Sequence, residues 1–177
     1  MRTYKLTLER ALECFDYNPD TGSMKWKVQN TLFANIGDEV GTPQLPRKRY
    51  RIVCVDAEKH RVHRIAWLLM MGNWPRHNID HVDGDGMNNR WDNLREATGS
   101  ENLYNRSKTI RNTSGFKGVH LQKNKWAARI QADGVNHWLG VYNTPEEASK
   151  AYDRASLKFH GKYAYINRIH KSNKEGV

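Results

Sequence analysis

The chain has 177 residues, which is room for one large domain or two small ones. Its 38% content of hydrophobic residues and its six tryptophans can supply real cores, so a globally disordered chain is not expected. A net charge of +10 with an isoelectric point of about 9.7 either serves solubility or, as we favour, indicates a polyanionic partner, most simply nucleic acid.

Cysteine use and hydropathy narrow the cellular setting. Cys14 and Cys54 form no CxxC pair and no zinc set, so we expect them to be reduced core residues of an intracellular protein. The N-terminal segment has no apolar signal core, and no apolar run reaches the roughly 18 residues that a membrane span requires. Neither secretion nor a membrane span is therefore expected.

The first predicted elements are a helix and a hairpin. Segment 7–15 places Thr7 as a possible helix cap before apolar residues at helical spacing: Leu8, Ala11, Leu12 and Phe15. A turn and a short strand follow. The hairpin comes next, with "RYRIVCV" as one strand, "AEK" as the turn and "HRVHR" as the returning strand. The run "RIAWLLMMGNWP" then predicts a short apolar helix that ends at Gly72 and Pro75.

A basic cluster lies at the start of this hairpin. Its members are Arg47, Lys48, Arg49 and Arg51. Two interpretations stay open at this point, because such a cluster is either a solvated edge or a set of contacts to DNA phosphates.

Segment 76–106 predicts strand, loop, strand and helix. "RHNIDHV" is strand-like, "DGDGMNN" is a polar loop, "LREAT" is a second strand, and "SENLYNR" is a helix capped by Thr98 or Ser100. Six of the 14 Asp and Glu of residues 1–110 lie in this segment, and residues 1–110 carry 17 Lys and Arg against those 14 acids. Residues 111–177 carry 12 against 5. An acid-rich pocket inside a basic protein can hold a cation against a polyanion.

The residue types in this segment suit hydrolysis of a phosphodiester. A hard cation such as Mg²⁺ prefers oxygen ligands, which Asp80 and Asn102 would supply. His81 can take a proton from water near pH 7, and the carbonyl oxygen of Asn93 would fix its tautomer. The alternative is a surface histidine among ordinary turn residues. A calcium loop is not expected, because the EF-hand spacing is absent.

A third part of the chain follows a polar linker. Three short strands, "FKGVHLQ", "KWAARIQA" and "NHWLGVYN", predict an antiparallel meander with one polar face. A helix follows, with Thr144 as its cap, Pro145 at its first position, Glu147 completing a capping box and Gly161 ending it. One helix face is apolar: Ala148, Ala151, Tyr152, Ala155 and Phe159.

Residues 63–106, "HRIAWLLMMGNWPRHNIDHVDGDGMNNRWDNLREATGSENLYNR", resemble the HNH endonucleases, in particular the phage and intron-encoded homing type. The resemblance implies a ββα-metal fold. It also implies that His81 is the general base, that Asn93 orients it, and that Asp80 and Asn102 hold the metal ion. Asn105 competes with Asn102 for the last position. Because this position is not a histidine, a zinc site is not expected; Mg²⁺ is the expected metal, with Mn²⁺ as the alternative.

Residues 112–167 resemble an AP2/ERF DNA-binding domain, on "GV" after a basic residue, "KWAARI", "WLG", "EEASKAYDRA" and the closing Asn167. The resemblance implies a three-stranded sheet that is backed by a helix and lies in the DNA major groove. The implied contact residues are Lys117, His120, Gln122, Lys125, Arg129, Gln131, Asn136 and Trp138. Several of these are arginine in the plant proteins. Because Gln and Asn favour adenine, we do not expect the family's GC-rich target.

We therefore predict an α+β protein in which an N-terminal hairpin region and a ββα-metal HNH nuclease fold precede a three-stranded antiparallel sheet packed on one helix. The predicted parts are 1–59, an N-terminal region with possible DNA contact; 60–108, the HNH endonuclease domain; 109–115, a linker; 116–167, the AP2/ERF-like domain; and 168–177, a basic tail.

The predicted function is metal-dependent cleavage of double-stranded DNA at or near a recognised site, as in a phage homing endonuclease. We expect no obligatory protein partner and a cytoplasmic location in a bacterial or phage-infected cell. Two alternatives remain: a non-catalytic AP2-type regulator, and a phage nuclease of low specificity in packaging or repair.

Overall fold

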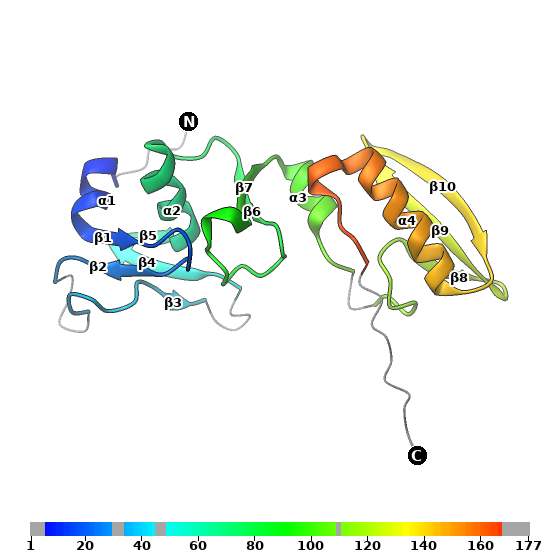
Figure 1. Cartoon of the computed structure of the whole chain (residues 1–177), viewed down its shortest axis with the longest axis horizontal. Coiled ribbons are helices and arrows are strands. Elements are labelled where there is room, and N and C mark those ends of the chain that lie inside the picture. The colour runs from blue at the N-terminus through cyan, green and yellow to red at the C-terminus, as the bar shows by residue number, and fades with distance from the viewer. Residues whose placement is uncertain (1–5, 30–33, 45–48, 109–110, 168–177) are drawn as a thin grey trace, which may run out of the picture. The chain divides into compact units, whose positions relative to one another are not determined.

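The structure is a computed structural model that describes residues 6–29, 34–44, 49–108 and 111–167 (Figure 1). The chain divides into two compact units, 1–99 and 100–177. Both combine helices with small antiparallel strands, which confirms the predicted mixed α+β class. Within the described ranges, no helix is long and apolar enough to cross a membrane.

The first unit consists of short elements joined by turns. In chain order they are α1 (Leu8–Cys14), β1 (Phe15–Tyr17), β2 (Met24–Trp26), β3 (Thr42–Pro43), β4 (Arg51–Val55), β5 (Glu58–Arg61), α2 (Val62–Met71), β6 (Asn78–His81), a 3₁₀ turn (Trp91–Asn93) and β7 (Leu94–Ala97). The described strands pair antiparallel as β1–β2, β3–β4–β5 and β6–β7.

Local sequence explains where the helices of this unit begin and end. The Thr7 side chain accepts a hydrogen bond from the Arg10 amide (3.2 Å) and caps α1, as predicted. Gly72 ends α2 in the left-handed conformation (φ 73°), also as predicted. The predicted return strand "HRVHR" was wrong in its second half, because β5 ends at Arg61 and α2 begins at Val62. Burial at helical spacing favours the helix there, for Val62, Ile65, Ala66 and Leu68 are all buried.

A single apolar core holds the first unit together. It joins residues from α1 and β2 to residues from α2, β6 and β7, among them Met24, Ile65, Ile79 and Leu94. The core thus contains residues from both of the predicted segments 1–59 and 60–108. Cys14 is buried, as expected, but Cys54 is exposed, so the prediction that both cysteines are core residues was wrong. Alternation along β4 turns Val53 and Val55 inward, which leaves Cys54 facing solvent.

The second unit contains α3 (Gly99–Asn105), β8 (Val119–Gln122), β9 (Lys125–Ala132), β10 (Val135–Tyr142), α4 (Pro145–His160) and a 3₁₀ turn (Gly161–Tyr163). The strands form the predicted meander, in the order β10–β9–β8, and α4 covers one face of it (Figure 1). The capping box of Thr144 and Glu147 is present. Phe159 is 37% exposed rather than buried; it stacks on His137, and His160 is buried beside it in the chain.

Helix α3 contacts the rest of the second unit through aromatic and polar side chains. The Tyr104 ring stacks on His160 (3.8 Å between ring centroids), and the Tyr104 hydroxyl accepts from the Asp133 amide. Lys117 Nζ donates to the carbonyl oxygen of Tyr104 (2.6 Å), at the end of α3. Burial lowers the pKa of Lys117 to about 8. Lys117 therefore holds a helix end, where carbonyl groups attract a cation.

Gly118 offers a test of how tightly α4 packs on the sheet. It has φ +76°, and a Cβ atom there would strike the Tyr152 ring and lie 2.7 Å from the Arg129 carbonyl oxygen. We predict that Gly118→Ala lowers the free energy of unfolding of the second unit by about 2–4 kcal/mol, through backbone strain and overpacking. Gly134→Ala is the control, because Gly134 has a similar φ (+79°) and open space around it. Equal losses in urea unfolding of the two variants would contradict the packing argument.

Candidate active site

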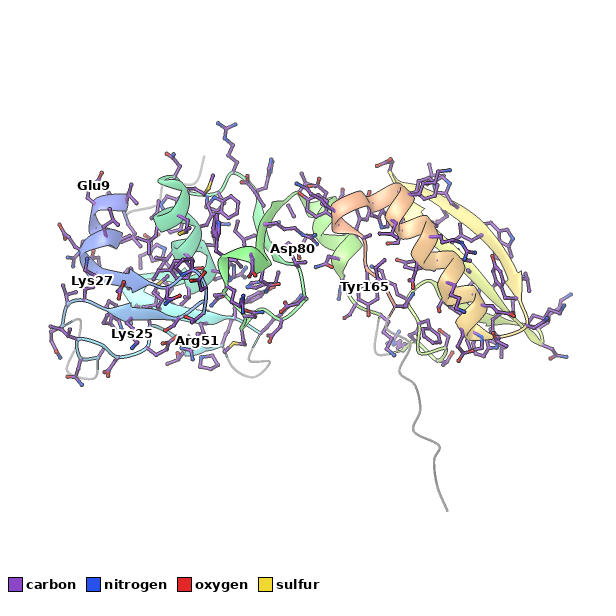
Figure 2. The ribbon with its side chains drawn as sticks, viewed as in Figure 1. Glu9, Lys25, Lys27, Arg51, Asp80 and Tyr165 are labelled. Atoms are coloured by element: carbon purple, nitrogen blue, oxygen red, sulfur yellow. The ribbon has the colours of Figure 1, made fainter. Side chains whose placement is uncertain are left out.

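The β6–β7 hairpin positions the predicted base, His81, and its neighbour Asp80, a predicted metal ligand. Asp80 pairs with Arg95 and His81 with Leu94 in the strand register, and both Asp80 and His81 are buried. Asp80 Oδ2 accepts hydrogen bonds from Arg95 Nε (2.9 Å) and Nη2 (2.7 Å). Figure 2 labels Asp80 in the first unit. The carboxylate is thus held in place by the guanidinium directly across the hairpin.

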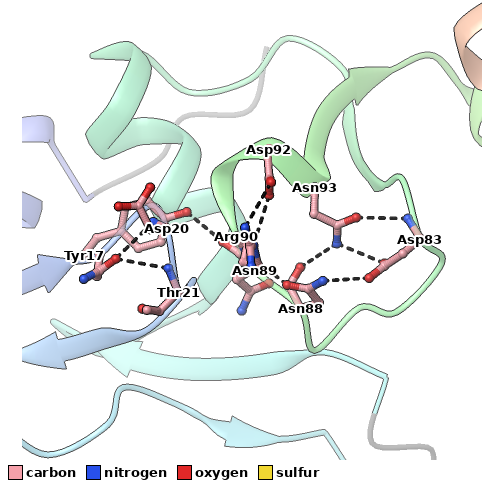
Figure 3. Close-up of polar contacts among 10 residues, drawn as sticks. Tyr17, Asp20, Thr21, Asp83, Asn88, Asn89, Arg90, Asp92 and Asn93 are labelled. Carbon is pink, nitrogen blue, oxygen red and sulfur yellow. Dashed lines mark hydrogen bonds and ion pairs between the residues drawn. The ribbon is translucent and has the colours of Figure 1, made fainter.

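The loop after His81 is closed by the side chain of Asn93 (Figure 3). Asn93 Oδ1 accepts from the Asp83 amide (3.0 Å), and Asn93 Nδ2 donates to Asp83 Oδ1 (3.0 Å) and to the Asn88 carbonyl oxygen (2.8 Å). Asn88 Nδ2 donates to the second oxygen of Asp83 (2.7 Å). Burial opposes ionisation of Asp83, but these bonds outweigh it and lower the pKa of that carboxyl.

The residue that contacts the His81 imidazole is Asn89. Asn89 Oδ1 lies 3.2 Å from His81 Nε2, and Asn89 is 3% exposed. We predicted this orienting contact for Asn93, whose side chain bonds instead to Asp83 and Asn88. Asn89 therefore fixes the tautomer directly, with Nε2–H as donor and Nδ1 left as the acceptor.

The β1–β2 hairpin supports Asn89 from outside the HNH-like segment. Tyr17 Oη donates to the Asn89 carbonyl oxygen (2.7 Å), and the Trp91 amide donates to the Pro19 carbonyl oxygen (2.9 Å). A Cβ atom at Gly22 would strike the backbone of Asn89 and Arg90, so these two segments of the backbone are in contact. Figure 3 shows Tyr17 and Asn89 among these polar contacts. The turn between β1 and β2 thus supports the backbone of the loop that carries Asn89.

Ring contacts surround the other side of His81. The His63 ring lies edge-on to it (5.0 Å between centroids), and the Tyr50 ring lies 5.9 Å away. Burial lowers the pKa of His81, although the Asn89 hydrogen bond and nearby aspartates oppose that shift. His63 is buried, and its pKa lies well below the ordinary value. Both imidazoles are therefore neutral near pH 7, the state in which His81 accepts a proton.

The predicted metal ligands come from both compact units. Asp80 belongs to the first unit, whereas Asn102 and Asn105 lie on α3 in the second, so their pairing stays a prediction. Asn102 is half-buried and Asn105 is buried. The described part of the chain holds no group of three or more His, Cys, Asp or Glu that would bind a metal ion. A carboxylate with an amide oxygen, completed by water and phosphate, remains a donor set that suits Mg²⁺.

The predicted basic cluster divides into residues with different partners. Arg47 and Lys48 lie outside the described residues. Arg51, labelled in Figure 2, is half-buried, and its Nη1 donates to the carbonyl oxygens of Val40 and Gly41. Arg49 is exposed and stacks over the Tyr50 ring (5.5 Å). Arg51 therefore braces the β3–β4 region, and Arg49 is the member that faces solvent.

Most of the AP2-like contact positions lie together on the sheet face that α4 leaves open. Register pairs Arg129 with Trp138 and Gln131 with Asn136, and opposed residues share a face. Lys125 pairs with Gln122, and His120 lies next along that strand on the same side. The exposed members of this set are Gln122, Lys125, Arg129, Gln131, Asn136 and Trp138; His120 is half-buried. Lys117 is separate from them, at the end of α3.

Three residues of the site were not predicted from the sequence: Tyr50, His63 and Asn89. Asn89 stands beside Asn88 in "GMNN", and nothing in the spacing distinguishes the two. His63 and Tyr50 reach His81 only through tertiary packing, over 18 and 31 positions of the chain. The sequence did contain one signal for His63, which is a polar residue beside the apolar positions of a predicted helix; the structure shows it buried on α2.

Comparisons with known proteins match this part of the chain to a nuclease family. A family model described as HNH endonuclease matches residues 60–104. HNH endonuclease L560 of Acanthamoeba polyphaga mimivirus is 31% identical over 120 residues, which are 66% of this chain and 62% of that protein. Protein 3.8 of Escherichia phage T7 is 34% identical over 107 residues, 59% of this chain and 88% of the phage protein. This chain thus spans less than two thirds of the mimivirus protein.

A second similarity concerns plant proteins. An AP2/ERF and B3 domain-containing transcription factor of Arabidopsis thaliana is 48% identical over 50 residues, 28% of this chain and 14% of the plant protein. No solved structure gives a significant match. The matched segment 60–104 contains the hairpin, the closed loop, His81 and Asn102, and the phage relative is similar over most of its own length. The chain belongs to the HNH endonuclease family.

Proposed function

We propose that this protein is a metal-dependent endonuclease that cuts double-stranded DNA, with His81 as general base. One observation carries the proposal: a buried imidazole, whose pKa burial lowers, is held by Asn89 next to the buried Asp80. A fixed tautomer makes the other ring nitrogen the proton acceptor of the imidazole, and the lowered pKa of His81 keeps that nitrogen unprotonated at neutral pH, the state in which it can accept a proton from water.

Metal binding is assigned to oxygen donors. Asp80 and Asn102 would hold a divalent cation, Mg²⁺ first and Mn²⁺ as the alternative, with Asn105 as the competing residue on α3. When bound, the cation supplies charge stabilisation at the scissile phosphate. Arg95 donates two hydrogen bonds to Asp80 Oδ2 and so fixes the position of the carboxylate that would meet the cation.

Placement on DNA is assigned to the open face of the β8–β9–β10 sheet. Its exposed polar side chains and Trp138 form a band suited to the edges of base pairs, and residues 111–177 carry most of the net charge. We propose a homing-type nuclease, in which this sheet selects the site that His81 cuts. A non-catalytic regulator is less well supported, because it has no use for a buried base and its closed loop.

The first prediction concerns the base itself. His81→Ala should lower nicking of supercoiled plasmid in Mg²⁺ by about 10²–10⁴-fold, the range of a lost general base, while DNA affinity stays near that of the wild type. His77→Ala is the control, because His77 is exposed just before the same strand. A native rate in His81→Ala, or equal cutting by the wild type in EDTA, would show that the assignment is wrong.

The second prediction separates Asn89 from Asn93. Asn93→Ala removes three hydrogen bonds that close the loop, so it should cost about 2–4 kcal/mol of unfolding free energy and slow cleavage as well. Asn89→Ala removes the partner of His81 and should slow cleavage with the smaller cost of about 1 kcal/mol. Single-turnover rates and urea unfolding measure both quantities. Slower cleavage by Asn93→Ala with unchanged stability would instead give Asn93 a direct role at the imidazole.

The third prediction concerns the sheet face. Lys125→Ala should reduce the slope of log affinity against log salt by about one, as expected for one lost phosphate contact. Arg129→Ala should weaken discrimination between target and non-target DNA by about 1–3 kcal/mol. The control is Lys150→Ala, because Lys150 is exposed on α4, which packs on the other face of the sheet. If Lys150→Ala changes the slope as much as Lys125→Ala, the open face is not the reading surface.

A further inference from the structure

The Tyr50 ring connects the candidate base to two arginines. Its centroid lies 5.9 Å from that of His81 and 5.1 Å from that of His63. Above the same ring lie the guanidinium carbons of Arg61 (4.9 Å) and Arg49 (5.5 Å). Stacking of this kind orients a guanidinium and restricts its rotamers. Two cations are thus held on a ring that also lies beside the imidazole.

The position of this ring is fixed by the loop of the HNH segment. A Cβ atom at Gly86 would lie 2.7 Å from the Tyr50 ring and would strike the Arg49 carbonyl oxygen. Gly86 is buried, so the backbone of the loop packs directly on Tyr50. The Tyr50 carbonyl oxygen also accepts from the Gln44 amide (2.8 Å). The ring therefore packs between the β4–β5 hairpin and the loop that follows His81.

Charge pairing separates these two arginines from four others in the first unit. Four arginines of that unit have carboxylate partners within 4 Å: Arg10, Arg51, Arg90 and Arg95. Among the residues that the structure describes, no carboxylate pairs with Arg49 or Arg61, and both side chains are exposed. Arginines that serve only solubility do not need to stack on an aromatic ring. Guanidinium groups that are oriented and have no carboxylate partner suit an anion that presents oxygen atoms.

We propose that Arg49 and Arg61, held on the Tyr50 ring, bind phosphate groups of the DNA strand that passes His81. The proposal rests on the endonuclease function above and adds the contact that positions the strand at the base. Guanidinium groups bind phosphate oxygens through paired hydrogen bonds, independently of base sequence. Holding the neighbouring phosphates restricts the scissile bond to the reach of His81, which raises the rate by reducing the entropy lost at the reaction step.

A binding assay tests the phosphate contact without cleavage. The full chain carrying His81→Ala is titrated onto a duplex DNA in Mg²⁺ at several salt concentrations. Adding Arg61→Ala should reduce the slope of log affinity against log salt by about one. Adding Lys59→Ala should leave the slope unchanged, although it removes the same charge. Lys59 is exposed on the same face of β5, two residues before Arg61, and is the matched control.

A cleavage assay tests the positioning role. With His81 intact and DNA in excess of its dissociation constant, Arg61→Ala should lower the single-turnover nicking rate by about 10–100-fold, the range for a lost hydrogen bond to a charged group. Tyr50→Leu keeps both arginines but removes their platform, and it should also lower this rate. Lys59→Ala should cut at the wild-type rate. Thermal unfolding of each variant checks that the first unit is folded.

Two outcomes would overturn the proposal. One is an equal change of salt slope in the Arg61 and Lys59 variants, which would reduce the effect to net charge. The other is a native nicking rate in folded Arg61→Ala. Failure of the endonuclease function has a different signature, because the wild-type protein would then not nick DNA in Mg²⁺. A slope reduced only by Arg61→Ala would in that case still support a phosphate contact beside Tyr50.

Discussion

The hydrogen bonds of the Asn93 side chain are the interaction on which the candidate active site depends. They join the end of the loop to Asp83 at its start and to the Asn88 backbone between them. The aspartates then bond to the loop's own amides, Asp83 to Asp85 (2.8 Å) and Asp85 to Met87 (2.9 Å). A segment rich in acids, amides and glycines thereby becomes ordered without an apolar core of its own.

This closed loop explains how a polar segment presents a base. It places Asn89 against His81 and packs Gly86 on Tyr50, so the imidazole is bounded by one amide and by rings. The same burial that makes the imidazole neutral also removes water from most of its surface. The loop therefore tolerates little change at Gly86, where a Cβ atom would strike the Arg49 carbonyl oxygen and the Tyr50 ring.

Periodicity and turn chemistry predicted most elements, because these signals are local. The capping box at Thr144, the end of α2 at Gly72 and the meander of three strands all depend on residues a few positions apart. The identity of the His81 partner depends instead on contacts between distant segments, such as Tyr17 with Asn89 across 72 positions. Resemblance to a family assigns roles by position in a motif, and it assigned Lys117 to DNA. The structure adds a contact that the motif does not contain, from Lys117 Nζ to the end of α3.

The contact between the β1–β2 turn and the loop at Asn89 and Arg90 has a consequence for protein engineering. A fragment trimmed to the HNH-matching segment would lack Tyr17, Pro19 and Gly22, and it would leave core residues such as Ile65 without their partners from α1 and β2. A nuclease cassette grafted onto a different DNA-reading domain therefore has to begin at or before Leu6. It also has to extend through α3, so that the asparagines assigned to the metal travel with the base.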